Sequence, residues 1–88
     1  MVRKRIVVAG EVQGVNFREA CRTIAAENGV GGWVRNLRDG RVEAVFEGPP
    51  ETVDRVVAWA QDGPVAARVA DVAVHLEQPE GLTTFLVK

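Results

Sequence analysis

The sequence predicts an α+β fold in which two helices cover one face of an antiparallel sheet. Three observations support this prediction. Several short segments carry the β-branched or alternating pattern of strands, two others carry apolar residues at helical spacing, and Asp39-Gly40 marks a hairpin between two strand segments. Because the chain has 88 residues and 47% of them are hydrophobic, we expect a single domain over residues 1–88 with one modest core.

The first elements are a strand and a helix. The β-branched run Ile6-Val7-Val8-Ala9, within residues 3–10, is typical of a buried strand. A helix follows, because apolar residues recur at helical spacing, namely Phe17, Ala20, Cys21, Ile24 and Ala25. Asn16 and Glu19 have the spacing of a capping box at its start, and Gly29 is a typical stop.

A hairpin comes next. The segments 32–38 and 41–47 flank Asp39-Gly40, the strongest short-range hairpin signal in the chain. In the second segment apolar residues alternate with charged ones, and these apolar residues are Val42, Ala44 and Phe46. This alternation predicts a half-buried strand.

The last third of the chain adds a helix and two strands. Pro49-Pro50 suits a helix start, Gly63-Pro64 suits its end, and the apolar stripe between them is Val53, Val56, Val57 and Ala60. Residues 68–78 alternate as a strand, and residues 83–87 form a last short one. The order β-α-β-β-α-β, with a short extra C-terminal strand, favours a ferredoxin-like sandwich with two helices on one face of an antiparallel sheet.

Composition argues against several classes of partner. The formal net charge is -1 and the sequence pI is about 5.8, so no overall charge steers the chain toward nucleic acid or an anionic membrane. No apolar run approaches the roughly 20 residues that cross a bilayer. The single cysteine, Cys21, cannot form an internal disulfide. We therefore expect a cytoplasmic monomer without nucleic-acid or membrane partners.

The segment Val12-Gln13-Gly14-Val15-Asn16-Phe17-Arg18 connects the first strand to the first helix. A glycine-containing loop that opens a helix points several backbone N–H groups at one place, and the helix dipole adds positive potential there. Arg18 falls in the first helical turn, where its guanidinium can donate to two oxygens of a phosphate. The segment therefore predicts a phosphate cradle formed by Arg18 and by the N–H groups of Gln13, Gly14, Val15, Asn16, Phe17 and Arg18.

The residue inventory restricts the chemistry. The chain has no serine and no tyrosine, Cys21 falls on an apolar helix stripe, and His75 stands alone on a strand, where we expect a surface side chain. No cluster has metal-ligand spacing, so we expect no metal and no cofactor. A fixed cation, backbone donors and amides remain. They suit the hydrolysis of an acyl phosphate, whose carboxylate leaving group has a pKa near ~4 and needs little acid catalysis.

Asn36 supplies an amide for the attacking water. It stands on the strand segment that leads into the hairpin. We expect that segment to lie beside the first strand, which would bring Asn36 to the cradle.

At these two segments the chain closely resembles the acylphosphatase family. Gly10 and Val12–Arg18 match the family's Gly-x-Val-Gln-Gly-Val-x-Phe-Arg signature, and Gly32–Asn36 with Asp39-Gly40 match Gly-Trp-Val-x-Asn and the later Asp-Gly. The resemblance spans nearly the whole chain. It implies hydrolysis of a small-molecule acyl phosphate to carboxylate and inorganic phosphate by an acid-anhydride hydrolase that uses no metal or cofactor. It also implies that Arg18 binds the phosphate, that Asn36 orients the attacking water and that the loop N–H groups hold the phosphoryl oxygens.

Three other interpretations stay open from the residues. An RNA-recognition module shares the element order, but it needs stacking aromatics and a basic face that the strand Val42–Phe46 and the net charge do not provide. A phosphate or acyl-phosphate sensor without turnover would use the same cradle, and only Asn36 argues for catalysis. The third is the acylphosphatase-like domain that opens larger carbamoyl-transfer maturation proteins, which the short length of the chain disfavours.

Overall fold

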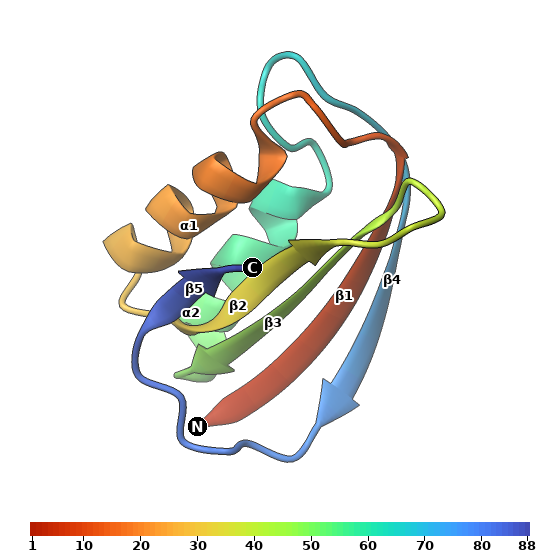
Figure 1. The fold of residues 1–88 in the computed structure, drawn as a ribbon. Coiled ribbons are helices and arrows are strands. Elements are labelled where there is room, and N and C mark those ends of the chain that lie inside the picture. The colour runs from red at the N-terminus through yellow and green to blue at the C-terminus, as the bar shows by residue number, and fades with distance from the viewer.

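The computed structural model describes residues 1–88 and has a five-stranded sheet with both helices on one of its faces (Figure 1). The predicted elements and their order are confirmed. Their bounds are β1 Val2–Glu11, α1 Phe17–Glu27, β2 Gly31–Asn36, β3 Val42–Gly48, α2 Pro50–Ala60, β4 Arg68–Glu77 and β5 Phe85–Val87. Neither helix is long and apolar enough to cross a membrane.

The strand order is β4-β1-β3-β2-β5. β1 pairs antiparallel with β3 and β4, β2 pairs antiparallel with β3, and β5 adds to the edge of β2 in parallel. The sheet is therefore mixed at this edge. The expectation that the strand before the hairpin lies beside the first strand is wrong, because β3 separates β1 from β2.

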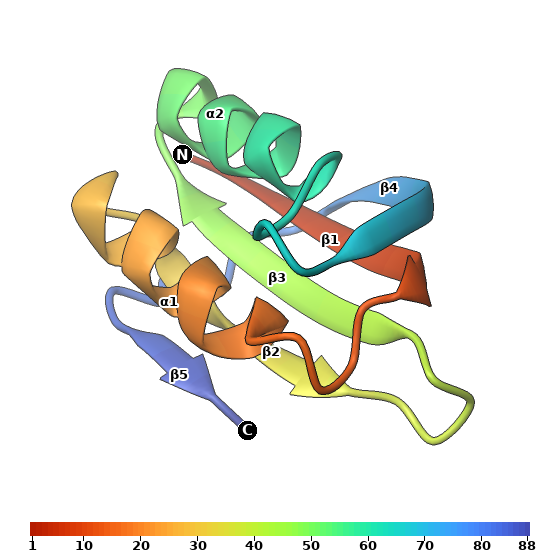
Figure 2. The same cartoon turned by 90° about the horizontal axis from the view of Figure 1, so that it is seen from above.

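The β1–α1 loop and the β2–β3 hairpin nevertheless meet at one end of the sheet (Figures 1 and 2). β1 and β2 each run antiparallel to β3, so they run parallel to one another on its two sides. Their carboxyl ends therefore lie at the same end of the sheet, and this arrangement positions the candidate site residues that follow or end them.

The hydrophobic core lies between the sheet and the two helices. α1 packs over β2 and β5, and α2 packs over β1 and β3 (Figure 2). The predicted helix stripes face this core, where the buried residues include Phe17, Cys21, Ala25, Val53, Val56 and Ala60. Burying a large apolar side chain contributes about 1.5–3 kcal/mol, so these contacts hold both helices onto the sheet. Phe17 and Trp59 join the helices with ring centroids 5.3 Å apart.

Charged side chains cover the other face of the sheet. Arg3 contacts Glu47 at 2.8 Å and Glu77 at 3.0 Å, while Arg5 contacts Glu77 at 2.9 Å and Glu43 at 3.3 Å. The expectation that β3 is half-buried is wrong, because all its residues are buried, including both glutamates. The central position of β3 and the arginines over it shield this second face from solvent.

Glu47 also fixes the segment that connects β4 to β5. Its carboxylate accepts hydrogen bonds from the backbone N–H groups of Glu80, Gly81 and Leu82 at 2.9–3.2 Å. Burial favours a higher pKa for Glu47, but the guanidinium of Arg3 and these N–H groups together lower its pKa below the ordinary value. Glu47 thereby anchors the segment that precedes β5.

Candidate active site

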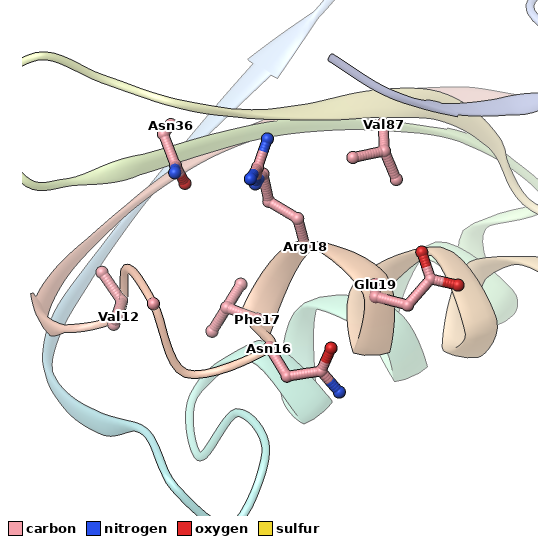
Figure 3. A pocket seen from close by; sticks show the side chains of 8 residues that line it. Val12, Asn16, Phe17, Arg18, Glu19, Asn36 and Val87 are labelled. Carbon is pink, nitrogen blue, oxygen red and sulfur yellow. The ribbon is translucent and has the colours of Figure 1, made fainter.

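One pocket of about 220 Å³ lies where β1 and β2 end. Side chains and backbone from the β1–α1 loop, the first turn of α1, the end of β2 and β5 line it (Figure 3). The lining residues are Val12, Gly14, Asn16, Phe17, Arg18, Glu19, Asn36 and Val87. The pocket therefore brings together the loop segment Val12–Arg18, the end of β2 and the last strand, β5.

The β1–α1 loop leaves its backbone N–H groups without backbone partners. Gly14 and Asn16 adopt left-handed conformations, with φ of 74° and 67°, which turn the chain sharply before α1. None of the backbone N–H groups of residues 13–18 donates a backbone–backbone hydrogen bond. Such a set of unpaired N–H groups at a helix N-terminus is an anion-binding arrangement.

The predicted capping box at the start of α1 is wrong. The side chain of Asn16 makes no capping hydrogen bond, and the carboxylate of Glu19 pairs with Arg22 one turn later. The left-handed backbone of Asn16 differs from the β-region conformation that a capping residue normally adopts. As a consequence, the N–H of Asn16 remains available to a ligand.

Arg18 extends from the first turn of α1 toward Asn36 (Figure 3). Its Nη1 donates a hydrogen bond to the main-chain oxygen of Lys88 at 2.8 Å, which holds the guanidinium at the pocket. Glu19, the next residue, is paired with Arg22 and not with Arg18. The positive charge of Arg18 is therefore directed at the pocket without a carboxylate partner from its own helix.

Asn36 is the last residue of β2, opposite Val42 in the register of the hairpin. It lines the same pocket as Arg18, on the side formed by the sheet. The arrangement thus brings together the cation, the amide and the loop, although β1 and β2 are not neighbours.

Gln13 connects the loop to the hairpin. Its Nε2 donates hydrogen bonds to the carbonyl oxygens of Leu37 at 2.7 Å and Arg41 at 2.9 Å. Sequence reasoning assigned Gln13 only a backbone N–H, and neither its side chain nor Val15 lines the pocket. The side chain of Gln13 instead fixes the cradle relative to the strand end that carries Asn36.

The two nucleophilic or basic side chains considered from sequence lie outside the pocket, as expected. Cys21 is fully buried, and burial raises the pKa of its thiol to about 12. His75 is exposed on β4. No group of three or more histidine, cysteine, aspartate or glutamate residues has the geometry of a metal site.

Sequence reasoning missed Val12, Glu19 and Val87 as pocket residues. Val12 begins the loop segment Val12–Arg18, so its place beside the cradle could have been predicted from that motif. Glu19 was assigned to a cap. Val87 has no local signal, because only the parallel pairing of β5 with β2 brings it to the pocket.

Comparison with known proteins decides the family. The acylphosphatase family model matches residues 4–87. The chain belongs to the acylphosphatase family. An acylphosphatase of Gloeobacter violaceus is 58% identical to it over 86 residues, which cover 98% of this chain and 92% of that protein. Relatives at this identity are named as acylphosphatases, which are hydrolases.

Solved structures agree with the acylphosphatase assignment. The crystal structure of acylphosphatase from Bacillus subtilis superposes with a TM-score of 0.96 at 36% identity and covers 100% of this chain and 99% of that one. T. kodakarensis HypF contains a similar unit, with a TM-score of 0.86 and 32% identity, but the match covers only 12% of that chain. The acylphosphatase match therefore spans both chains almost completely, whereas the HypF match covers a small part of a larger protein.

Proposed function

We propose that this pocket hydrolyses the carboxyl–phosphate bond of small-molecule acyl phosphates. The N–H groups of residues 13–18 and the guanidinium of Arg18 bind the phosphoryl oxygens, and the Asn36 amide orients the attacking water. One observation carries the proposal: a loop whose N–H groups donate no backbone–backbone hydrogen bond, a guanidinium without a carboxylate partner on its own helix, and one amide all border a single pocket. Phosphoryl transfer depends mainly on positioning and charge stabilisation, which these groups provide.

The reaction needs no further catalytic group. The water oxygen forms a new bond to phosphorus, the bond between phosphorus and the carboxyl oxygen breaks, and both water protons stay on the phosphate product, which then exchanges protons with solvent. The leaving carboxylate is stable without a proton at neutral pH, because its pKa is near ~4. The products are a carboxylate and inorganic phosphate, and phosphate or a similar anion would also bind the cradle as an inhibitor.

We further propose that the protein acts as a monomer in the cytoplasm. The loop, Arg18 and Asn36, which are the groups that the proposed reaction uses, already meet within a single copy of the chain, and this supports a monomer. The single buried thiol of Cys21 is consistent with a reducing compartment. Light scattering after size exclusion would test the monomer, which a stable dimer at micromolar concentration would exclude.

The test of the function is release of inorganic phosphate from acetyl phosphate and benzoyl phosphate in excess EDTA. We expect fast hydrolysis by the wild type and a large loss in Arg18→Ala. If the wild type binds phosphate but hydrolyses neither substrate, the chain is an anion sensor and the proposed function is wrong.

A further inference from the structure

The pocket contains more than the phosphate cradle and the two polar groups that act on it. Glu19 and Val87 line it as well, and neither has a role in holding phosphate or water. Val87 is 39% exposed and offers an apolar surface from β5, and Glu19 is an exposed carboxylate on the first turn of α1. These two side chains line the pocket beside the phosphate-binding groups, where they can contact another part of the substrate.

The geometry of the displacement indicates which part. The attacking water and the leaving carboxylate lie on opposite sides of phosphorus in an in-line reaction. Asn36 and Glu19 lie on opposite sides of the Arg18 side chain, and Val87 flanks Arg18 on the side of Glu19 (Figure 3). If Arg18 holds the phosphoryl group and the water lies at Asn36, as the proposed function has it, the in-line path directs the acyl group toward Glu19 and Val87.

Glu19 is charged at neutral pH. The hydrogen bond from Arg22 lowers the pKa of the Glu19 carboxyl below its ordinary value. Arg22 donates through Nε at 3.0 Å and also through Nη2, but its side chain does not line the pocket. Of this ion pair only the Glu19 carboxylate lines the pocket, so an acyl group on this side meets the negative member of the pair first.

We propose that Glu19 is a specificity-determining residue that disfavours acyl phosphates whose acyl group carries a second negative charge. Together with the apolar surface of Val87, it selects uncharged acyl groups. This proposal rests on the proposed function, because it assigns the acyl side of the same site.

The test compares two substrates with acyl chains of four carbons, succinyl phosphate and butyryl phosphate. The measured quantity is the ratio of their kcat/KM values, which does not depend on the fraction of folded enzyme. Against the wild type at low ionic strength, we expect Glu19→Gln to raise the succinyl-to-butyryl ratio about two- to fivefold, the effect of an exposed charge pair. Salt at about 0.5 M should reduce this change.

Two further variants separate charge from structure. Arg22→Gln removes the partner of Glu19 and should lower the ratio, opposite to Glu19→Gln. Glu27→Gln, an exposed residue at the far end of α1, should leave the ratio unchanged.

The outcomes distinguish this inference from the function on which it rests. Suppose that the wild type hydrolyses both substrates. If the succinyl-to-butyryl ratio is then the same in all variants, or changes in the same direction in Glu19→Gln and Arg22→Gln, the role of Glu19 is wrong and the function stands. If the wild type hydrolyses neither substrate, the proposed function fails and the inference fails with it.

Discussion

Under the proposed function, Arg18 and Asn36 act at different stages of the reaction. Arg18 carries a permanent charge held at the pocket by the main-chain oxygen of Lys88, so we expect it to attract the phosphoryl group both before and during the reaction. Asn36 is neutral, and the proposal gives it the position of a water that matters only as the new bond forms. Substitutions of the two residues should therefore have different kinetic signatures.

For Arg18→Ala we expect loss of both phosphate binding and turnover. Removing one preorganised donor of a developing charge typically lowers kcat by about 10²–10³-fold, and loss of a full charge should reach at least that range. Calorimetric titration with inorganic phosphate and steady-state kinetics with benzoyl phosphate measure the two effects. Arg38→Ala is the matched control, because Arg38 is exposed in the hairpin turn and does not line the pocket.

For Asn36→Ala we expect kcat to fall about 10²–10³-fold while the dissociation constant of phosphate changes little. Asn28→Ala provides the comparison, since the Asn28 amide donates to Ile24 at the end of α1 and is not a pocket residue. Equal losses of affinity and turnover in Asn36→Ala would contradict a water-positioning role.

At the scale of elements, the β1–α1 loop depends on left-handed glycine. Gly14 has φ of 74° and Gly29, at the end of α1, has φ of 65°, and an added Cβ meets no atom within 4 Å at either position. Alanine at each should cost about 1–2 kcal/mol of unfolding free energy. Because only Gly14 lines the pocket, only Gly14→Ala should also weaken phosphate binding, by about tenfold or more.

Urea unfolding and phosphate titration of the two glycine variants give this comparison directly. Equal phosphate affinity in both variants would mean that the cradle does not hold phosphate at Gly14.

Glu47 makes the stability of the fold dependent on acid. Its pKa is lowered in the folded protein, so its contribution is fully present above the ordinary value of 4.5 and is lost as the pH falls through the lower folded value. Glu47→Gln should reduce the free energy of unfolding at pH 7 by about 3 kcal/mol, because it removes one partner of a buried ion pair. It should also flatten the loss of stability below about pH 4.5.

Urea unfolding at neutral and acidic pH measures both effects, with Glu27→Gln as an exposed control. A Glu47→Gln protein that loses as much stability in acid as the wild type would exclude this carboxyl as a source of the acid dependence.

The elements could be predicted from sequence because their signals are local. Apolar spacing located both helices, and Asp39-Gly40 located the hairpin. The neighbour of β1 could not be predicted in the same way, since strand order depends on how all crossovers pack. The burial of Glu43 and Glu47 could not be predicted from sequence either, because arginines from other strands cover β3.

At the scale of the whole molecule, the pocket is assembled from distant parts of the chain. Arg18, Asn36 and the loop could be selected from their motifs, although their joint placement needed the fold. Val87 could not, because only the parallel pairing of β5 with β2 brings it to the pocket. The predicted capping role of Glu19 was wrong because its carboxylate pairs with Arg22 and does not accept the backbone N–H of Asn16.

The molecule as a whole lacks a group that titrates near neutrality at the pocket. The ionisable side chains that line it are Arg18 and Glu19, and the pKa of Glu19 is lowered by Arg22. We therefore expect kcat/KM to stay nearly constant between about pH 6 and about pH 8, the range in which histidine normally titrates. A steep pH dependence that disappears in His75→Ala would contradict this, because His75 lies outside the pocket.

The most direct measurement is hydrolysis of acetyl phosphate by the wild type in ¹⁸O-labelled water, with mass analysis of both products. If water held at Asn36 attacks the phosphoryl group in the cradle, one ¹⁸O atom enters the inorganic phosphate and the acetate stays unlabelled. Label in the acetate would show attack at the carbonyl carbon and would contradict the roles assigned to Arg18, Asn36 and the loop.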